Sequence, residues 1–117
     1  MKVRLVDLAH ARSGDKGNIA NVGVIALRPE WYPVIAREVT VDRVAKHYAG
    51  AINGPVERFE LANLHALNFL LHGALDGGGT LSLRTDAQGK VYSTSMLRLV
   101  LDVPDDEARR LGLPSAP

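Results

Sequence analysis

The hydrophobic period changes at Pro29, and this change restricts the folds open to the chain. Before it, the runs 3–12 and 19–27 are rich in Val, Ile and Leu, which is typical of strands. After it, apolar residues recur at three- and four-residue spacing, with Thr40 placed to cap a helix and Gly50 placed to end it. We therefore expect two antiparallel strands followed by two short helices or one bent helix.

A third strand and a further helix are expected in the middle of the chain. Residues 56–62 have strand character, with Phe59 and Leu61 expected to face inward. Beyond this strand, leucines repeat at the spacing of one helical face: Leu64, Leu67, Leu71 and Leu75. This stripe predicts a helix over residues 64–75, with Asn63 as its N-cap and the glycines 77–79 as its end.

Two segments near the C-terminus are predicted to form a hairpin. Residues 80–85 and 91–103 flank a polar loop, 86–90. The apolar run 96–101 also suits a buried helical turn, so strand and helix both stay open there. Residues 105–117 are polar and flanked by proline, and we expect a C-terminal tail with at most one helical turn.

The expected order is strand, strand, helix, strand, helix, strand, strand. Two or three helices are too few to cover both faces of a parallel sheet. We therefore expect a two-layer α+β sandwich, with a mostly antiparallel sheet and helices on one face. The 117 residues suffice for one core, placed in a domain over residues 1–104 with the tail 105–117 behind it. An uncovered sheet face or edge favours self-association, so a homo-oligomer is expected.

The composition excludes several classes of protein. The 14 Lys and Arg against 13 Asp and Glu leave a formal charge of +1, which argues against a broad basic surface for nucleic acid or an anionic membrane. Cysteine is absent, which excludes disulfides, thiolate catalysis and cysteine zinc sites. No apolar run reaches the length of a membrane span, and the start of the chain has no signal-peptide core. We expect a soluble, cytoplasmic protein.

Polar residues are densest between positions 10 and 18, and Asn21 follows closely. Glycines in a loop here would let main-chain amides cradle an anion, while an arginine and a lysine supply positive charge. The ligand-binding candidates of this loop are Arg12, Ser13, Gly14, Lys16, Gly17 and Asn18. Asp15 either pairs with a neighbouring cation or accepts a proton, and an ordinary hairpin loop with a solvated ion pair explains the same residues. The glycine spacing matches no nucleotide-binding motif, so no cofactor is expected.

Two further polar clusters follow. In the predicted helix, His65, Asn68 and His72 share one face, and His65 is a candidate general base because imidazole titrates near neutral pH. A structural histidine explains the same position, and no metal site is expected because asparagine is a poor transition-metal ligand. Ser82 and Arg84 share one face of a predicted strand, where they bind a ligand or form a cross-strand ion pair.

Four strings of residues together resemble one known family: ARSGDKGN at 11–18, NLHALNF at 63–69, GGTLSLR at 78–84 and GK at 89–90. They are similar to the small C-terminal domain of acyclic-terpene-utilisation protein A (AtuA), over roughly residues 3–104. The resemblance implies a ferredoxin-like fold, a larger AtuA-type protein as partner, and a place in the breakdown of branched or terpenoid acyl-CoA. It names no catalytic residue. The candidates that fall on the matching strings are Arg12, Ser13, Asp15, Lys16, Asn18, His65, Asn68, Ser82 and Arg84.

Two functions remain open. In the first, the chain is the small subunit of an acyl-CoA lyase or hydratase. Arg12, Lys16 and the loop amides would bind a carboxylate or CoA thioester, and His65 or Asp15 would move a proton. In the second, the chain is a non-catalytic assembly or ligand-sensing module that pairs with the AtuA-type protein or with its own copies. RNA binding is disfavoured, because only 5% of residues are aromatic.

Overall fold

The computed structural model describes residues 1–74 and 90–117 of the chain. Four antiparallel strands form the larger sheet, in the order β2 (Ala9–Lys16), β3 (Ile19–Ala26), β5 (Ala66–His72) and β4 (Val56–Leu61). Two short strands, β1 (Lys2–Arg4) and β6 (Val100–Asp102), pair separately. The helices are α1 (Tyr32–Glu38), α2 (Val41–His47), α4 (Lys90–Met96) and α5 (Asp105–Leu111). Three short 3-10 turns complete the described elements: η1 (Leu5–Asp7), η2 (Pro29–Trp31) and η3 (Ala62–Leu64).

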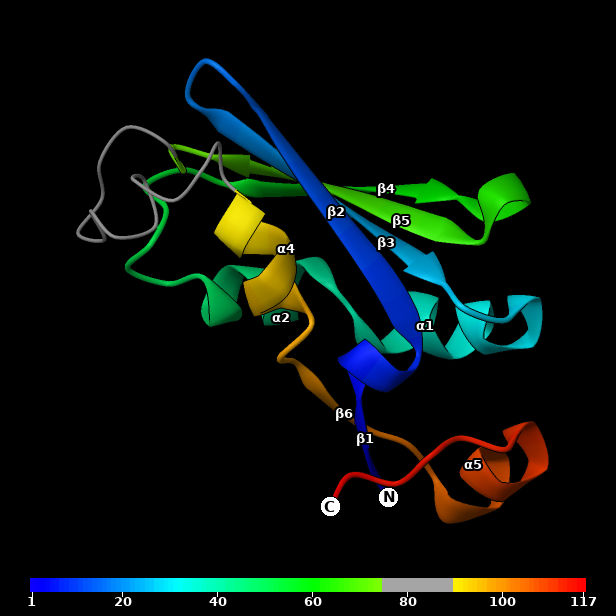
Figure 1. The fold of residues 1–117 in the computed structure, drawn as a ribbon. Coiled ribbons are helices and arrows are strands. Elements are labelled where there is room, and N and C mark those ends of the chain that lie inside the picture. The colour runs from blue at the N-terminus through cyan, green and yellow to red at the C-terminus, as the bar shows by residue number, and fades with distance from the viewer. Residues whose placement is uncertain (75–89) are drawn as a thin grey trace.

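The helices α1, α2 and α4 all lie on one side of the four-stranded sheet (Figure 1). The chain therefore has the two-layer, antiparallel α+β architecture of a ferredoxin-like fold, and this prediction is confirmed. The predicted strand over residues 80–85 and the glycines 77–79 lie outside the described residues.

The first hairpin differs from its prediction in two places. The expected strand over 3–12 is interrupted by η1, where Leu5 turns into the core. The expected loop over residues 13–18 is wrong, because β2 continues to Lys16 and pairs there with Ile19. Only Gly17 and Asn18 turn the chain. Gly17 adopts φ +62°, the left-handed backbone that two-residue hairpin turns favour.

The segment predicted as a helix over residues 64–75 contains β5, so that prediction is wrong. Leu67, Phe69 and Leu71 alternate along β5 and are fully buried, as the two-residue period of a strand requires. Residues four apart share one face of a strand as well as one face of a helix, so the leucine spacing fits both structures. The segment forms a strand because it pairs with β3 on one side and with β4 on the other.

The helices before β4 agree with the sequence. The chain forms η2, α1 and α2 where two short helices or one bent helix were expected, and Thr40 caps α2 by accepting a hydrogen bond from the Arg43 main-chain nitrogen at 3.2 Å. The strand β4 was also expected, but the inward direction of Phe59 and Leu61 is wrong. Val56 faces the core, so the strand period turns Phe59 and Leu61 to the opposite face.

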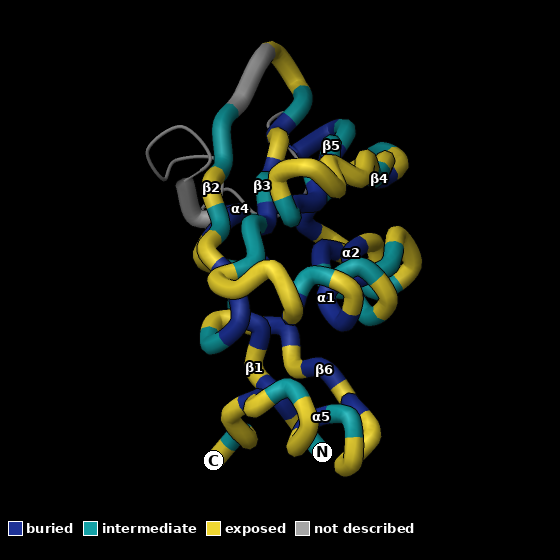
Figure 2. Tube along the Cα trace, turned by 90° about the vertical axis from the view of Figure 1, so that its right-hand side faces the viewer, coloured by how far each residue is buried: buried dark blue, intermediate teal, exposed yellow. Residues whose placement is uncertain are grey.

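The core lies between the sheet and the helices, as the burial pattern shows (Figure 2). Two buried tyrosines of this core form hydrogen bonds next to α4. The Tyr48 hydroxyl donates to the main-chain oxygen of Tyr92 at 2.5 Å, and the Tyr92 hydroxyl donates to the main-chain oxygen of Ala74 at 2.5 Å. Burial raises the pKa of Tyr48, which keeps its hydroxyl protonated as a donor.

The C-terminal residues contain more helix than expected. The segment 91–103 forms both structures left open for it, helix α4 and then strand β6. Beyond it, the expectation of at most one helical turn is wrong, because α5 spans seven residues. The Trp31 indole nitrogen donates to the main-chain oxygen of Leu111 at 2.8 Å, and Arg37 holds Glu107 through two hydrogen bonds of 2.7 and 2.9 Å. Of the helices described, none is both long and apolar enough to cross a membrane.

Candidate ligand-binding face

The second face of the four-stranded sheet is left uncovered by the described helices (Figure 1). Directly paired residues of an antiparallel sheet point to the same side, so the strand register gives the residues of this open face. In strand order β2, β3, β5, β4, its central row is Arg12, Gly23, Asn68 and Phe59. The rows on either side are Gly14, Asn21, Leu70 and Glu57, and His10, Ile25, Ala66 and Leu61.

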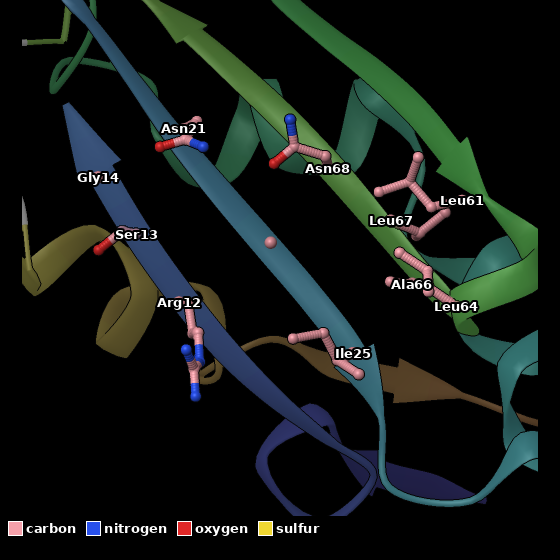
Figure 3. Close-up of a pocket in the computed structure, with 11 residues that line it drawn as sticks. Arg12, Ser13, Gly14, Asn21, Ile25, Leu61, Leu64, Ala66, Leu67 and Asn68 are labelled. Carbon is pink, nitrogen blue, oxygen red and sulfur yellow. The ribbon is translucent and has the colours of Figure 1, made fainter. Parts of the chain in front are cut away.

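An open hollow of about 580 Å³ lies on this face. Its volume falls within the range of small-molecule sites. Figure 3 shows that its two sides differ in character. The polar side chains that line it are Arg12 of β2, Asn21 of β3 and Asn68 of β5. Toward the end of the sheet next to η3 the lining side chains are apolar: Ile25, Leu61, Leu64 and Ala66.

Three polar side chains of the hollow, those of Arg12, Asn21 and Asn68, have no partner within the described fold. Neither the Arg12 guanidinium nor the carboxamides of Asn21 and Asn68 make a side-chain hydrogen bond or ion pair with residues 1–74 or 90–117. The guanidinium extends toward the outer edge of β2, away from Asn68 (Figure 3). These groups are free to bind a ligand, and a guanidinium favours a carboxylate or a phosphate.

Two glycines shape the floor of the hollow. At Gly14, a Cβ atom would lie 2.9 Å from the Asn21 Oδ1 atom, so this glycine gives the carboxamide its room. At Gly23, a Cβ atom would meet nothing closer than 3.9 Å, where the Arg12 main-chain oxygen and the Asn68 Oδ1 atom lie. The missing side chain of Gly23 therefore leaves open space between Arg12 and Asn68.

The structure brings four of the sequence-predicted ligand-binding residues to this hollow: Arg12, Ser13, Gly14 and Asn68. It does not form the predicted loop of anion-binding amides, because residues 13–16 belong to β2. Gly17 and Asn18 lie at the hairpin turn, away from the hollow lining, and the Asn18 main-chain oxygen accepts hydrogen bonds from the nitrogens of Gly73 and Ala74. The side chains of Asp15 and Lys16, and all of Ser82 and Arg84, lie outside what the structure describes.

His65 does not line the hollow. It adopts a left-handed backbone with φ 52° before β5, and its ring packs edge-on against Tyr32 of α1 with centroids 6.1 Å apart. The expected helical face of His65, Asn68 and His72 is wrong, because this segment is a strand. Asn68 and His72 share the open face of β5, whereas a role for His65 in proton transfer stays a prediction.

The sequence analysis missed several residues of the open face. Gly23, Ile25 and Leu64 line the hollow, and the Glu57 carboxylate lies 2.5 Å from the His72 Nε2 atom further along the same face. The two-residue alternation of β3 and β4 was the available signal for this face. It could be used only after residues 66–72 had been recognised as the strand between them. The described part of the chain contains no group of three or more His, Asp or Glu side chains that could hold a metal ion.

Comparison with protein families decides where this fold belongs. The sequence model of the AtuA ferredoxin-like domain matches residues 3–102. The chain is a member of the AtuA ferredoxin-like domain family. The match includes every strand that forms the open face, ends at the last residue of β6 and leaves out α5. Comparisons with curated proteins and with solved structures gave no match. The family assignment indicates an AtuA-related role.

Proposed function

We propose that this chain is a small subunit that holds an anionic acyl ligand, a carboxylate or a CoA thioester, for a larger AtuA-type protein in acyl-CoA breakdown. The observation that carries the proposal is the hollow on the open face, which has a polar side and an apolar side. It offers one guanidinium and two carboxamides on one side and aliphatic side chains on the other. An acyl anion likewise has a charged head and an apolar tail, so each part of the ligand is matched by a complementary part of the hollow.

The hollow supports binding better than catalysis by this chain alone. Among the described residues that line it, Arg12 is the one titratable side chain, and arginine does not exchange protons near neutral pH. The proposed larger partner would therefore supply the groups that move protons in a lyase or hydratase reaction.

A partner over the open face also accounts for the apolar side chains at its border. Leu64 is 60% exposed, Phe59 46% and Leu61 39%, and all three belong to β4 or to η3 directly after it. Apolar groups gathered at one site of a surface are typical of contact sites. A covering partner would also exclude water from the Arg12 guanidinium and strengthen its attraction for an anion.

Isothermal titration of the purified chain with octanoate and with octanoyl-CoA tests the proposal, with and without the larger AtuA-type protein. We expect binding by the wild type and an affinity at least about tenfold weaker for Arg12→Gln, because a charge-assisted hydrogen bond is removed. Arg110→Gln, which removes an exposed arginine of α5, is the matched control and should bind as the wild type does. Absence of binding under all conditions, or equal affinities of the two variants, would contradict the proposal.

The second candidate is a non-catalytic assembly module, and the exposed apolar group on β4 and η3 favours it. Co-purification with the AtuA-type protein, read together with the octanoate and octanoyl-CoA titrations, separates the two functions. An assembly module would keep its partner after Arg12→Gln, lose it after Leu64→Lys, and bind neither acyl ligand.

A further inference from the structure

Gly23 lies in the interior of β3, where its presence is not explained by the fold. Its backbone does not adopt the positive φ of Gly17, Gly50, Gly73 and Gly112. A side chain there would also not collide with the described neighbours, in contrast to Gly14, Gly54 and Gly73. Glycine within a strand weakens it, because the unfolded chain loses more freedom on folding and no side chain packs. Another requirement must therefore favour glycine at this position.

The surroundings of Gly23 indicate what that requirement is. It lies between Arg12 and Asn68 in the central row of the open face, and both neighbours have polar groups without described partners. A glycine in a strand often marks a place where a ligand or another main chain approaches closely. None of the described segments crosses the sheet on this face, so within residues 1–74 and 90–117 no main chain fills the space above Gly23, and a bound ligand can occupy it.

We infer that the acyl ligand lies across the strands, in contact with the β3 main chain at Gly23. The absence of a side chain at this glycine provides the space for the acyl chain. This inference rests on the proposed function. The anionic head lies toward Arg12, and the apolar tail extends toward Leu61 and Leu64. The direction follows from the polar and apolar sides of the hollow.

The strand spacing gives the length of ligand that fits this path. From β2 to β4 there are three steps between neighbouring strands, or about 14 Å. Carbon–carbon bonds of about 1.5 Å advance an extended chain by roughly 1.3 Å each, so about eight to ten carbons cover the path once the flanking side chains reach inward. The predicted ligand class is a medium-length acyl carboxylate or its CoA thioester.

Titrations with butanoate, octanoate and octanoyl-CoA test this path in the wild type, Gly23→Ala and Gly23→Val. Because the first added carbon meets nothing closer than 3.9 Å, both variants should fold, which thermal unfolding would verify. We expect octanoate to bind the wild type more tightly than butanoate. Gly23→Val should weaken octanoate at least about tenfold, and Gly23→Ala less, because the added groups occupy the ligand's place. Val100→Ile, which adds one carbon on β6 outside the hollow, is the control and should change nothing.

The outcomes separate this inference from the proposed function. If the wild type binds octanoate and Gly23→Val binds it equally well, the path over Gly23 is wrong, while the proposed function stands. Butanoate binding as tightly as octanoate would also overturn the path. Binding of octanoyl-CoA alone would identify the thioester as the source of the acyl group, and tighter binding of octanoate would identify the free acid. If none of these ligands binds the wild type, both the inference and the proposed function fail.

Discussion

Replacing Gly23 with alanine is expected to stabilise the protein while it fills the floor of the hollow. The new Cβ atom would lie 3.9 Å from its nearest neighbours, the Arg12 main-chain oxygen and the Asn68 Oδ1 atom, which is ordinary van der Waals contact. The gain comes mainly from the unfolded chain, which has fewer conformations to lose with alanine than with glycine. We expect about 0.5–1 kcal/mol of added unfolding free energy, or roughly 2–5 °C in melting temperature for a domain of this size.

Urea unfolding followed by circular dichroism measures this gain without any ligand. With a slope of about 1.5 kcal/mol per molar urea, the midpoint should rise by roughly 0.3–0.7 M. Gly14→Ala is the matched comparison, because its Cβ atom would lie 2.9 Å from the Asn21 Oδ1 atom and must displace that carboxamide, so its gain should be smaller or absent. A Gly23→Ala protein less stable than the wild type would show that the β3 main chain itself requires glycine, and would refute the argument that the space is kept for a ligand.

Three further predictions concern the scaffold that holds the open face. Tyr92→Phe should lower the unfolding free energy by about 1–2 kcal/mol in chemical denaturation, because the buried Ala74 oxygen loses its hydroxyl donor; an unchanged stability would contradict the bond. Thr40→Ala should lower it by about 1 kcal/mol through loss of the helix cap, with Thr40→Ser as the variant that retains stability. Arg37 lowers the pKa of Glu107, so their pairing stabilises the fold above the ordinary carboxyl pKa and stops doing so as the pH falls through the lowered value. Glu107→Gln should therefore be destabilising at pH 7 and progressively less so as the pH falls below the ordinary carboxyl pKa in urea titrations, and an effect that does not change with pH would disprove the ionic origin.

The parts of the fold that could be predicted are those where local and tertiary signals agree. The spacing of apolar residues after Pro29, together with a capping threonine at position 40, identified α1 and α2 because each signal alone already favours a helix. The run 19–27 identified β3, because its branched residues suit a strand buried on one face.

The parts that were missed are those where tertiary pairing overrides composition. Residues 13–16 have the small and polar side chains of a turn, yet they pair with β3 and lengthen β2. Leu67 and Leu71 fit a helix as well as a strand, and only the two neighbouring strands on either side of β5 decide between them. The candidate site depended on that decision, because Asn68 reaches the open face next to Gly23 only when its segment is a strand.

Chemical-shift mapping of the amide groups during titration with octanoate tests the central claim most directly. The account predicts that the largest shifts fall on the open face, at Arg12, Gly23 and Asn68, and that the amides of α2 on the other side of the sheet stay unchanged. Shifts centred on the basic residues of α2, such as Arg43 and Lys46, or shifts confined to the hairpin turn at Gly17, would contradict it.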